Sequence, residues 1–291
     1  MDANDLIKKV RKIEIKTRGL SQNIFAGEYH SAFKGRGMMF SEVREYQYGD
    51  DIRDIDWNVT ARQNHPFIKV YEEERELTVM LLVDVSRSRL FGAVGEEKRE
   101  MIAEIAATLA FSAIQNNDKI GVIFFSNKIE KFIPPKKGRK HILFIISQLL
   151  DFQPEYSGTD IAEALRFFTD ALKKRTTTFL ISDFIDENDF SKALTIASNK
   201  HDVIGIQVYD KRDSSMPDVG LIKMQDLETG ETKWVDTNKT MRSRYNKWWY
   251  GRQQSVSETM MKNHVDFVSV ATDEDYVKAL MLLFKNRGIK K

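Results

Sequence analysis

The sequence predicts an α/β protein with a doubly wound, mainly parallel sheet of about six strands and an antiparallel edge strand. Two observations support this fold class. From Leu77 onward, apolar runs of strand length alternate with segments in which apolar residues recur at helical spacing. Residues 77–83 are apolar at almost every position, which is typical of a central strand buried on both faces.

The other elements follow in order along the chain. A helix over 96–115 carries Ile102, Ile105 and Leu109 on one face, and a strand at 120–125 comes next. Only a few residues separate it from a strand at 128–133, so these two strands are expected to form a hairpin with an antiparallel edge. The remaining pattern predicts helices at 141–150, 161–173 and 190–198, strands at 177–181, 203–208 and 265–270, and a closing helix at 276–284.

Two segments interrupt the alternation and define the expected domains. Residues 1–76 begin with an amphipathic helix and continue through glycine-containing loops of mixed charge. They hold too little apolar sequence for a core of their own, so we expect this N-terminal region to pack on a domain formed by 77–291. Within that domain, Thr229-Gly230 lies between two extended stretches, which predicts a hairpin insertion at 219–236.

Composition argues against several classes of function. The 291 residues include no cysteine, which excludes disulfides, thiolate metal sites and a cysteine nucleophile. Lys and Arg total 45 against 43 Asp and Glu, a balance that disfavours a nucleic-acid binder. No apolar run approaches the roughly 18 residues that cross a bilayer, and the N-terminus lacks a signal-peptide pattern, so we expect a cytoplasmic protein without a transmembrane segment. Peripheral contact between the basic first helix and a membrane surface stays open.

Residues 242–252 mix basic and aromatic side chains, which stacking on nucleic acid would also require. Met241, Tyr245, Trp248 and Met260 share one helical face, however, and we therefore expect the aromatic side chains to belong to the core.

Polar residues at the end of the first predicted strand form the main candidate site. The strand ends in Asp84-Val85-Ser86-Arg87-Ser88, and the carboxyl ends of parallel strands are where open α/β sheets place ligands. Extended alternation puts Asp84 and Ser86 on one side of the chain, and Ser88 can curl back over the same point. One carboxylate and two hydroxyls suit Mg²⁺, Mn²⁺ or Ca²⁺ better than zinc.

Two later segments are positioned to add oxygen ligands. The loop 157–160 opens a helix and offers the hydroxyl of Thr159. Asp183 closes the fourth strand, which in such a sheet lies beside the first. We expect both side chains to approach the pocket of Asp84.

Asp84-x-Ser86-x-Ser88, with Thr159 and Asp183 after it, resembles the metal-ion-dependent adhesion site of von Willebrand factor type A domains. The resemblance implies that these five residues bind Mg²⁺, Mn²⁺ or Ca²⁺ weakly, and that a partner protein adds a Glu or Asp to the metal. Arg87 and Arg89 flank the site. They could steer such a carboxylate, although their charge opposes cation binding.

A second resemblance covers residues 37–75, upstream of the candidate site. The stretches 40–46 (FSEVREY) and 49–57 (GDDIRDIDW), with Ala61-Arg62, resemble the bacterial family 58 of the domains of unknown function. Members of that family are associated with MoxR-type AAA+ ATPases, which implies such an ATPase as the partner. The charged residues of this block form either an internal ion-pair lattice or a partner surface, and Trp57 is expected to be packed. The candidates for partner contact are Arg44, Asp50, Arg53 and Arg62.

These observations favour a non-enzymatic, divalent-cation-dependent protein-interaction module. Two alternatives stay open: a metal-dependent phosphate-chemistry enzyme and a metal-free scaffold of the same fold. Phosphotransferases of the haloacid dehalogenase type need a second aspartate two residues after the first, as a general acid. Ser86 occupies that position here, which disfavours the enzyme.

Overall fold

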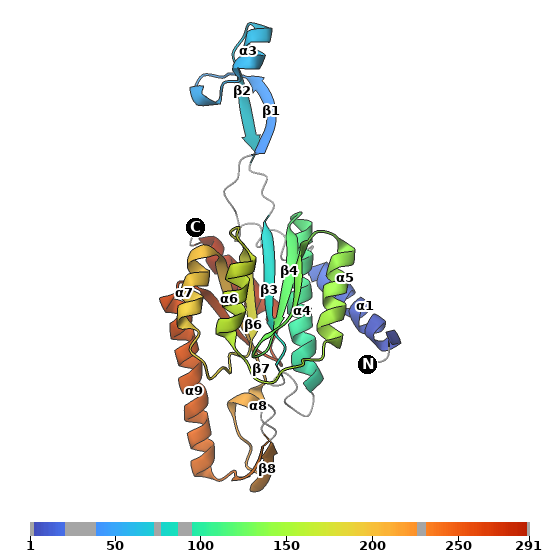
Figure 1. The fold of residues 1–291 in the computed structure, drawn as a ribbon, viewed down its shortest axis with the longest axis vertical. Coiled ribbons are helices and arrows are strands. Elements are labelled where there is room, and N and C mark those ends of the chain that lie inside the picture. Colours follow the sequence, from blue (N-terminus) through green and yellow to red (C-terminus); the bar gives the residue numbers. More distant parts are fainter. Residues whose placement is uncertain (1–2, 21–38, 73–76, 87–94, 226–230, 290–291) are drawn as a thin grey trace. The chain divides into compact units, whose positions relative to one another are not determined.

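A computed structural model describes residues 3–20, 39–72, 77–86, 95–225 and 231–289. The chain forms two compact units (Figure 1). One unit contains the N-terminal helix and the sequence from residue 77 onward, and the other contains residues 34–76.

The first unit is built on a six-stranded sheet in the order β10-β7-β6-β3-β4-β5. Every neighbouring pair is parallel except β4–β5, which is antiparallel. The first strand of the unit, β3, therefore lies in the interior, as in a doubly wound sheet, and the predicted fold class and antiparallel edge are confirmed. The strands are β3 (Thr78–Asp84), β4 (Lys119–Phe125), β5 (Ile129–Lys136), β6 (Thr177–Ser182), β7 (Asp202–Tyr209) and β10 (Asp266–Ala271).

Helices cover both faces of the sheet. Successive side chains of β3 point to opposite faces, and the strand is apolar on both because each face is buried. Val79, Leu81 and Val83 belong to one buried cluster, whereas Met80 and Leu82 belong to another. The first cluster contains side chains of α4 (Gly95–Gln115), α5 (Arg139–Asp151) and α10 (Tyr276–Ile289). The second contains side chains of α6 (Ile161–Ala171), α7 (Ser191–Lys200) and α9 (Lys239–Lys262).

The N-terminal helix α1 (Ala3–Leu20) packs against α4 and α5. Ile13 is buried in the first cluster, and Glu14 accepts a hydrogen bond of 2.6 Å from Nε of Arg139 in α5. The expected N-terminal region 1–76 is therefore divided differently in the structure. The first helix belongs to the same unit as the sheet, because its apolar face packs against α4 and α5.

The second unit is a small hairpin with two helical turns. Strands β1 (Met39–Glu45) and β2 (Phe67–Glu72) pair antiparallel, and between them lie η2 (Ile52–Asp54) and α3 (Trp57–Gln63). Among the side chains described in this unit, Ile68 is the one buried apolar group. Trp57 is 68% exposed, so the expectation that it is packed is wrong. It is the first residue of α3, which buries none of its side chains.

A short helix, a hairpin and a long helix connect β7 to β10. Strands β8 (Leu221–Gln225) and β9 (Thr232–Asp236) pair antiparallel within the segment where a hairpin insertion was expected. Helix α8 (Lys211–Ser214) precedes them, and α9 follows. In α9 the buried tryptophan is Trp249, whereas Trp248 is 47% exposed, which reverses the predicted orientation. No helix in the described part of the chain is both long and apolar enough to span a membrane.

Candidate metal centre

Asp84 is the last residue of β3 and is buried at the carboxyl edge of the sheet. Oδ1 of its carboxylate accepts the backbone N–H of Ser86 at 2.9 Å. Oδ2 accepts the hydroxyl of Ser182, at the end of the adjacent strand β6, at 2.6 Å. Ser86 is also buried, and its side chain hydrogen-bonds to the carboxylate of Asp84.

Asp183 follows β6 directly and is buried beside Asp84. Its Oδ1 accepts the N–H of Ile185 at 3.0 Å, and its backbone carbonyl accepts Nε2 of Gln207 at 2.8 Å. Phe184 adopts a left-handed conformation with φ of 58°, and its N–H donates to Oγ of Ser182 at 2.9 Å. Ser182 thus connects the turn that carries Asp183 to the carboxylate of Asp84.

The two carboxylates share an environment with little solvent. Burial, followed by the negative charge of Asp183, raises the pKa of Asp84 from 3.8 to about 6. Hydrogen bonds from Ser182 and Ser86 lower that pKa but do not offset the rise. Two like charges held together in this way favour a cation between or beside them.

Lys98 of α4 supplies one such cation. Its side chain is 3% exposed, and Nζ lies 2.7 Å from Oδ2 of Asp183 and 3.6 Å from Oδ2 of Asp213 in α8. Burial disfavours the charged amine, but Asp183, Asp213 and Asp84 outweigh this effect and raise the pKa of Lys98. The pKa of the Asp213 carboxyl is also raised. In this group burial causes the rise, because its effect outweighs the attraction of Lys98.

Lys98 was not predicted as part of the site, although its position on α4 could have indicated a buried charge. Lys98 precedes Ile102, Ile105 and Leu109 by four, seven and eleven residues, so it lies on the apolar face of α4. A charged residue on a face that packs on the sheet needs a buried partner of opposite charge.

Thr159 lies at the same edge of the sheet. The N–H of the next residue, Asp160, donates at 2.9 Å to the carbonyl of Ser126, which directly follows β4, the neighbour of β3. Oγ1 of Thr159 is buried and forms no hydrogen bond with any described residue. A buried hydroxyl without a partner is a group that a metal-bound water or a cation would satisfy.

The structure therefore brings Asp84, Ser86 and Asp183 together and places Thr159 at the same sheet edge. The donors are all oxygen atoms, which fits Mg²⁺, Mn²⁺ or Ca²⁺. Among the described residues there is no group of three or more His, Asp or Glu that could hold a metal, so any site here depends on hydroxyls. Ser88, Arg87 and Arg89 lie outside the described residues.

The other predicted contact residues belong to the second unit. Arg44 forms a two-point ion pair with Asp50, with N–O distances of 2.9 and 2.8 Å, and this pair holds the pKa of Asp50 below its usual range. Arg53 is paired with Asp51 at 3.3 Å, but its side chain is 90% exposed, and Arg62 is exposed. Arg44 and Asp50 thus stabilise the unit itself, whereas Arg53 and Arg62 are accessible to a partner.

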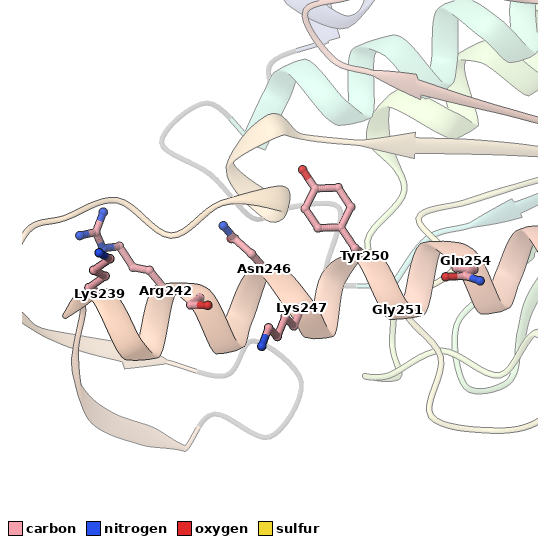
Figure 2. A pocket seen from close by; sticks show the side chains of 8 residues that line it. Lys239, Arg242, Asn246, Lys247, Tyr250, Gly251 and Gln254 are labelled. Carbon is pink, nitrogen blue, oxygen red and sulfur yellow. The ribbon is translucent and has the colours of Figure 1, made fainter.

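A hollow of about 700 Å³ lies along α9 (Figure 2). Its labelled lining residues include Lys239, Arg242, Asn246 and Tyr250, all on this helix. The lining contains no carboxylate, so the hollow does not provide a second candidate for a divalent cation.

The fold and the site define a doubly wound α/β domain with buried acidic and hydroxyl groups at the carboxyl edge of its sheet. The chain belongs to the family described as "Protein of unknown function DUF58", whose model matches residues 42–255. It is 27% identical over 289 residues to the uncharacterized protein Rv1480 of Mycobacterium tuberculosis, covering 99% of this chain and 91% of that protein.

Two solved structures are similar to the chain, each over 74% of its length and over 100% of the solved chain. An aerotolerance-related membrane protein from Bacteroides fragilis has a TM-score of 0.49 at 17% identity. The conserved hypothetical protein BatB from Bacteroides thetaiotaomicron has a TM-score of 0.47 at 18% identity.

Proposed function

We propose that this protein is a non-enzymatic protein-interaction module whose binding depends on a divalent cation. The observation that carries the proposal is the burial of Asp84 and Asp183 together at the carboxyl edge of the sheet, with the pKa of Asp84 raised by burial and by Asp183. Such an arrangement costs folding free energy unless positive charge offsets it. A costly charged cluster at a ligand-binding edge is a sign of function.

In this proposal Asp84, Asp183, Ser86 and Thr159 hold the cation, together with Ser88. When bound, the cation supplies an electrophilic position at which a carboxylate of the partner can replace a water molecule. The chain itself orients the donors: Ser182 fixes one oxygen of Asp84, and the amide of Ser86 fixes the other. The unpartnered hydroxyl of Thr159 supports a role as ligand or as acceptor for metal-bound water.

The direct test is a melting experiment with added Mg²⁺. Because few charged ligands are present, binding should be weak, and at about three times Kd the stabilisation is about 0.8 kcal/mol. For a chain of this length the melting temperature should rise by roughly 1–3 °C. Ser86→Ala should remove this rise, while Ser257→Ala, at an exposed serine of α9, should keep it. A rise that survives Ser86→Ala would place the metal elsewhere.

A metal-free scaffold is the second candidate, and the ion pair between Lys98 and Asp183 favours it. Lys98 already supplies a positive charge to the acidic cluster, so the cluster has a counter-ion without any metal. A scaffold would bind its partner equally well with Mg²⁺ and with EDTA. Phosphoester turnover by the same preparations would identify the enzyme alternative.

For the partner we propose a MoxR-type AAA+ ATPase that presents a Glu or Asp to the site. The proposal rests on the association with such ATPases that the sequence resemblance implies, and on the attraction of a bound cation for an acidic ligand.

A further inference from the structure

Lys98 connects three elements that meet at the acidic cluster. It extends from α4 to Asp183 at the end of β6 and to Asp213 in α8, with N–O distances of 2.7 and 3.6 Å. Its side chain and those of both partners are almost wholly buried. A buried lysine is costly unless it is paired, so its position here is fixed by the carboxylates.

Three buried carboxylates lie around the single ammonium of Lys98. Asp84, Asp183 and Asp213 are all buried and have a formal charge of three negative units when ionised, against the single positive charge of Lys98. The nearby Asp210 has its own ion pair with Arg212 at 3.1 Å. Among the described residues, the carboxylates of this cluster therefore outnumber the lysine that they share.

The geometry also gives Lys98 two places to bind. The ammonium is closer to Asp183 than to Asp213, and its four-carbon stem is flexible. A divalent cation at Asp84 and Asp183 would repel the ammonium and compete with it for the carboxylate of Asp183. Asp213 is not a proposed metal ligand, so it can still pair with Lys98 when a metal occupies Asp183.

We propose that Lys98 is a built-in competitor of the divalent cation: it shares Asp183 with the metal and is held by Asp213 when the metal binds. This inference rests on the proposed function and assigns the metal affinity to two residues that are not ligands. It also connects metal occupancy to α8, whose Asp213 carbonyl accepts the hydroxyl of Tyr245 of α9 at 2.8 Å.

The test is calorimetric titration of Mg²⁺, repeated with Mn²⁺, into the full chain. Lys98→Met removes the competing charge and keeps the length of the side chain, so Kd should fall by about tenfold. Asp213→Asn removes the alternative partner of Lys98, so Kd should rise severalfold. The control is Lys211→Met, which breaks an exposed ion pair with Asp273 and should leave Kd unchanged.

The double variant separates competition from a general effect of charge. If Asp213 acts through Lys98, Asp213→Asn in the Lys98→Met background should lose most of its effect on Kd. If Asp213 acts only as a nearby negative charge, the weakening should persist in the double variant and would overturn the inference. If Lys98→Met does not fold, Lys98→Gln replaces it in the single and double variants, because glutamine is also uncharged and keeps a hydrogen-bond donor for Asp183.

The outcomes also distinguish this inference from the proposed function. Equal Kd values in wild type, Lys98→Met and Asp213→Asn would make Lys98 a structural ion pair and leave the metal site standing. Absence of binding in wild type and in Lys98→Met alike would contradict the proposed function and this inference together.

Discussion

At the scale of single residues, His201 shows how burial without partners changes a titration. The residue follows α7 and is 1% exposed, and neither ring nitrogen has a hydrogen-bond partner among the described residues. Its ring lies 4.4 Å from that of Phe168, centroid to centroid. Burial, with the positive charges of Lys200 and Arg175, lowers the pKa of His201 from 6.5 to about 4.

This depressed pKa predicts a loss of stability in acid. Between pH 6.5 and 4 the unfolded chain protonates His201 and the folded chain does not, so the free energy of unfolding falls as pH falls through this range. The loss should be on the order of 2 kcal/mol, measured by denaturant unfolding at pH 7.5 and pH 4.5. His201→Gln stays neutral and should lose correspondingly less; identical losses in both proteins would contradict the assignment.

The sequence pattern predicted the residues of the site that follow strands, but it did not predict Lys98 and Asp213. Asp84, Ser86 and Asp183 stand at strand ends, where the fold class alone indicates a site. The ion pair of Lys98 with Asp183 joins residues 85 positions apart, and no local spacing predicts which carboxylate a buried lysine meets. Asp213 was missed for the same reason, since α8 has only four residues and no periodicity to detect.

At the scale of elements, the strands of the main sheet were predictable because each is a short apolar run between polar turns. The packing of α1 on the sheet domain was not predictable. An amphipathic pattern indicates that one helix face is buried, but it does not identify the elements that cover this face. The interior tryptophan of α9 was also assigned to the wrong face. Adjacent Trp248 and Trp249 differ by 100° around a helix, and tertiary packing selects between them.

The packing of α1 gives a prediction at this scale. Ile13 is 4% exposed in the cluster shared with α4 and α5, so Ile13→Ala should lower the free energy of unfolding by about 2–4 kcal/mol. Ile15 is on the same helix but 70% exposed, and Ile15→Ala should change stability by less than about 0.5 kcal/mol. Chemical denaturation of the full chain measures both, and equal effects would mean that α1 does not dock through Ile13.

The antiparallel edge of the sheet depends on Gly121 in β4. A Cβ at this position would lie 2.7 Å from the carbonyl oxygen of Ile133 and 2.7 Å from the nitrogen of Pro135, both backbone atoms of β5. Gly121→Ala should therefore destabilise the chain by about 1–3 kcal/mol. Gly251→Ala meets no atom within 4 Å in α9 and should be neutral or stabilising, because alanine favours a helix. Similar unfolding midpoints for the two variants would contradict the close approach of β5.

At the scale of the whole molecule, the family match extends over both units, since residues 42–255 include most of the small unit and most of the sheet domain. The two units differ in what they offer a partner. The sheet domain offers a buried acidic site at the carboxyl edge of its sheet, whereas the small unit offers exposed Trp57, Ile52 and Arg53 on a minimal core. A unit with so little core and so much exposed apolar surface is suited to contact another protein.

The proposed partner gives the last prediction, at this same scale. A MoxR-type AAA+ ATPase should be captured by the full chain in Mg²⁺, less well in EDTA, and not by Asp84→Ala, because the metal joins the acidic partner to the site. Asp170→Ala removes an exposed carboxylate of α6 and should bind like wild type. Arg53→Glu should weaken capture without changing its Mg²⁺ dependence if the small unit adds a contact of its own. Equal capture by wild type and Asp84→Ala in EDTA would refute the metal-bridged mechanism, and the metal-free scaffold would then explain the binding.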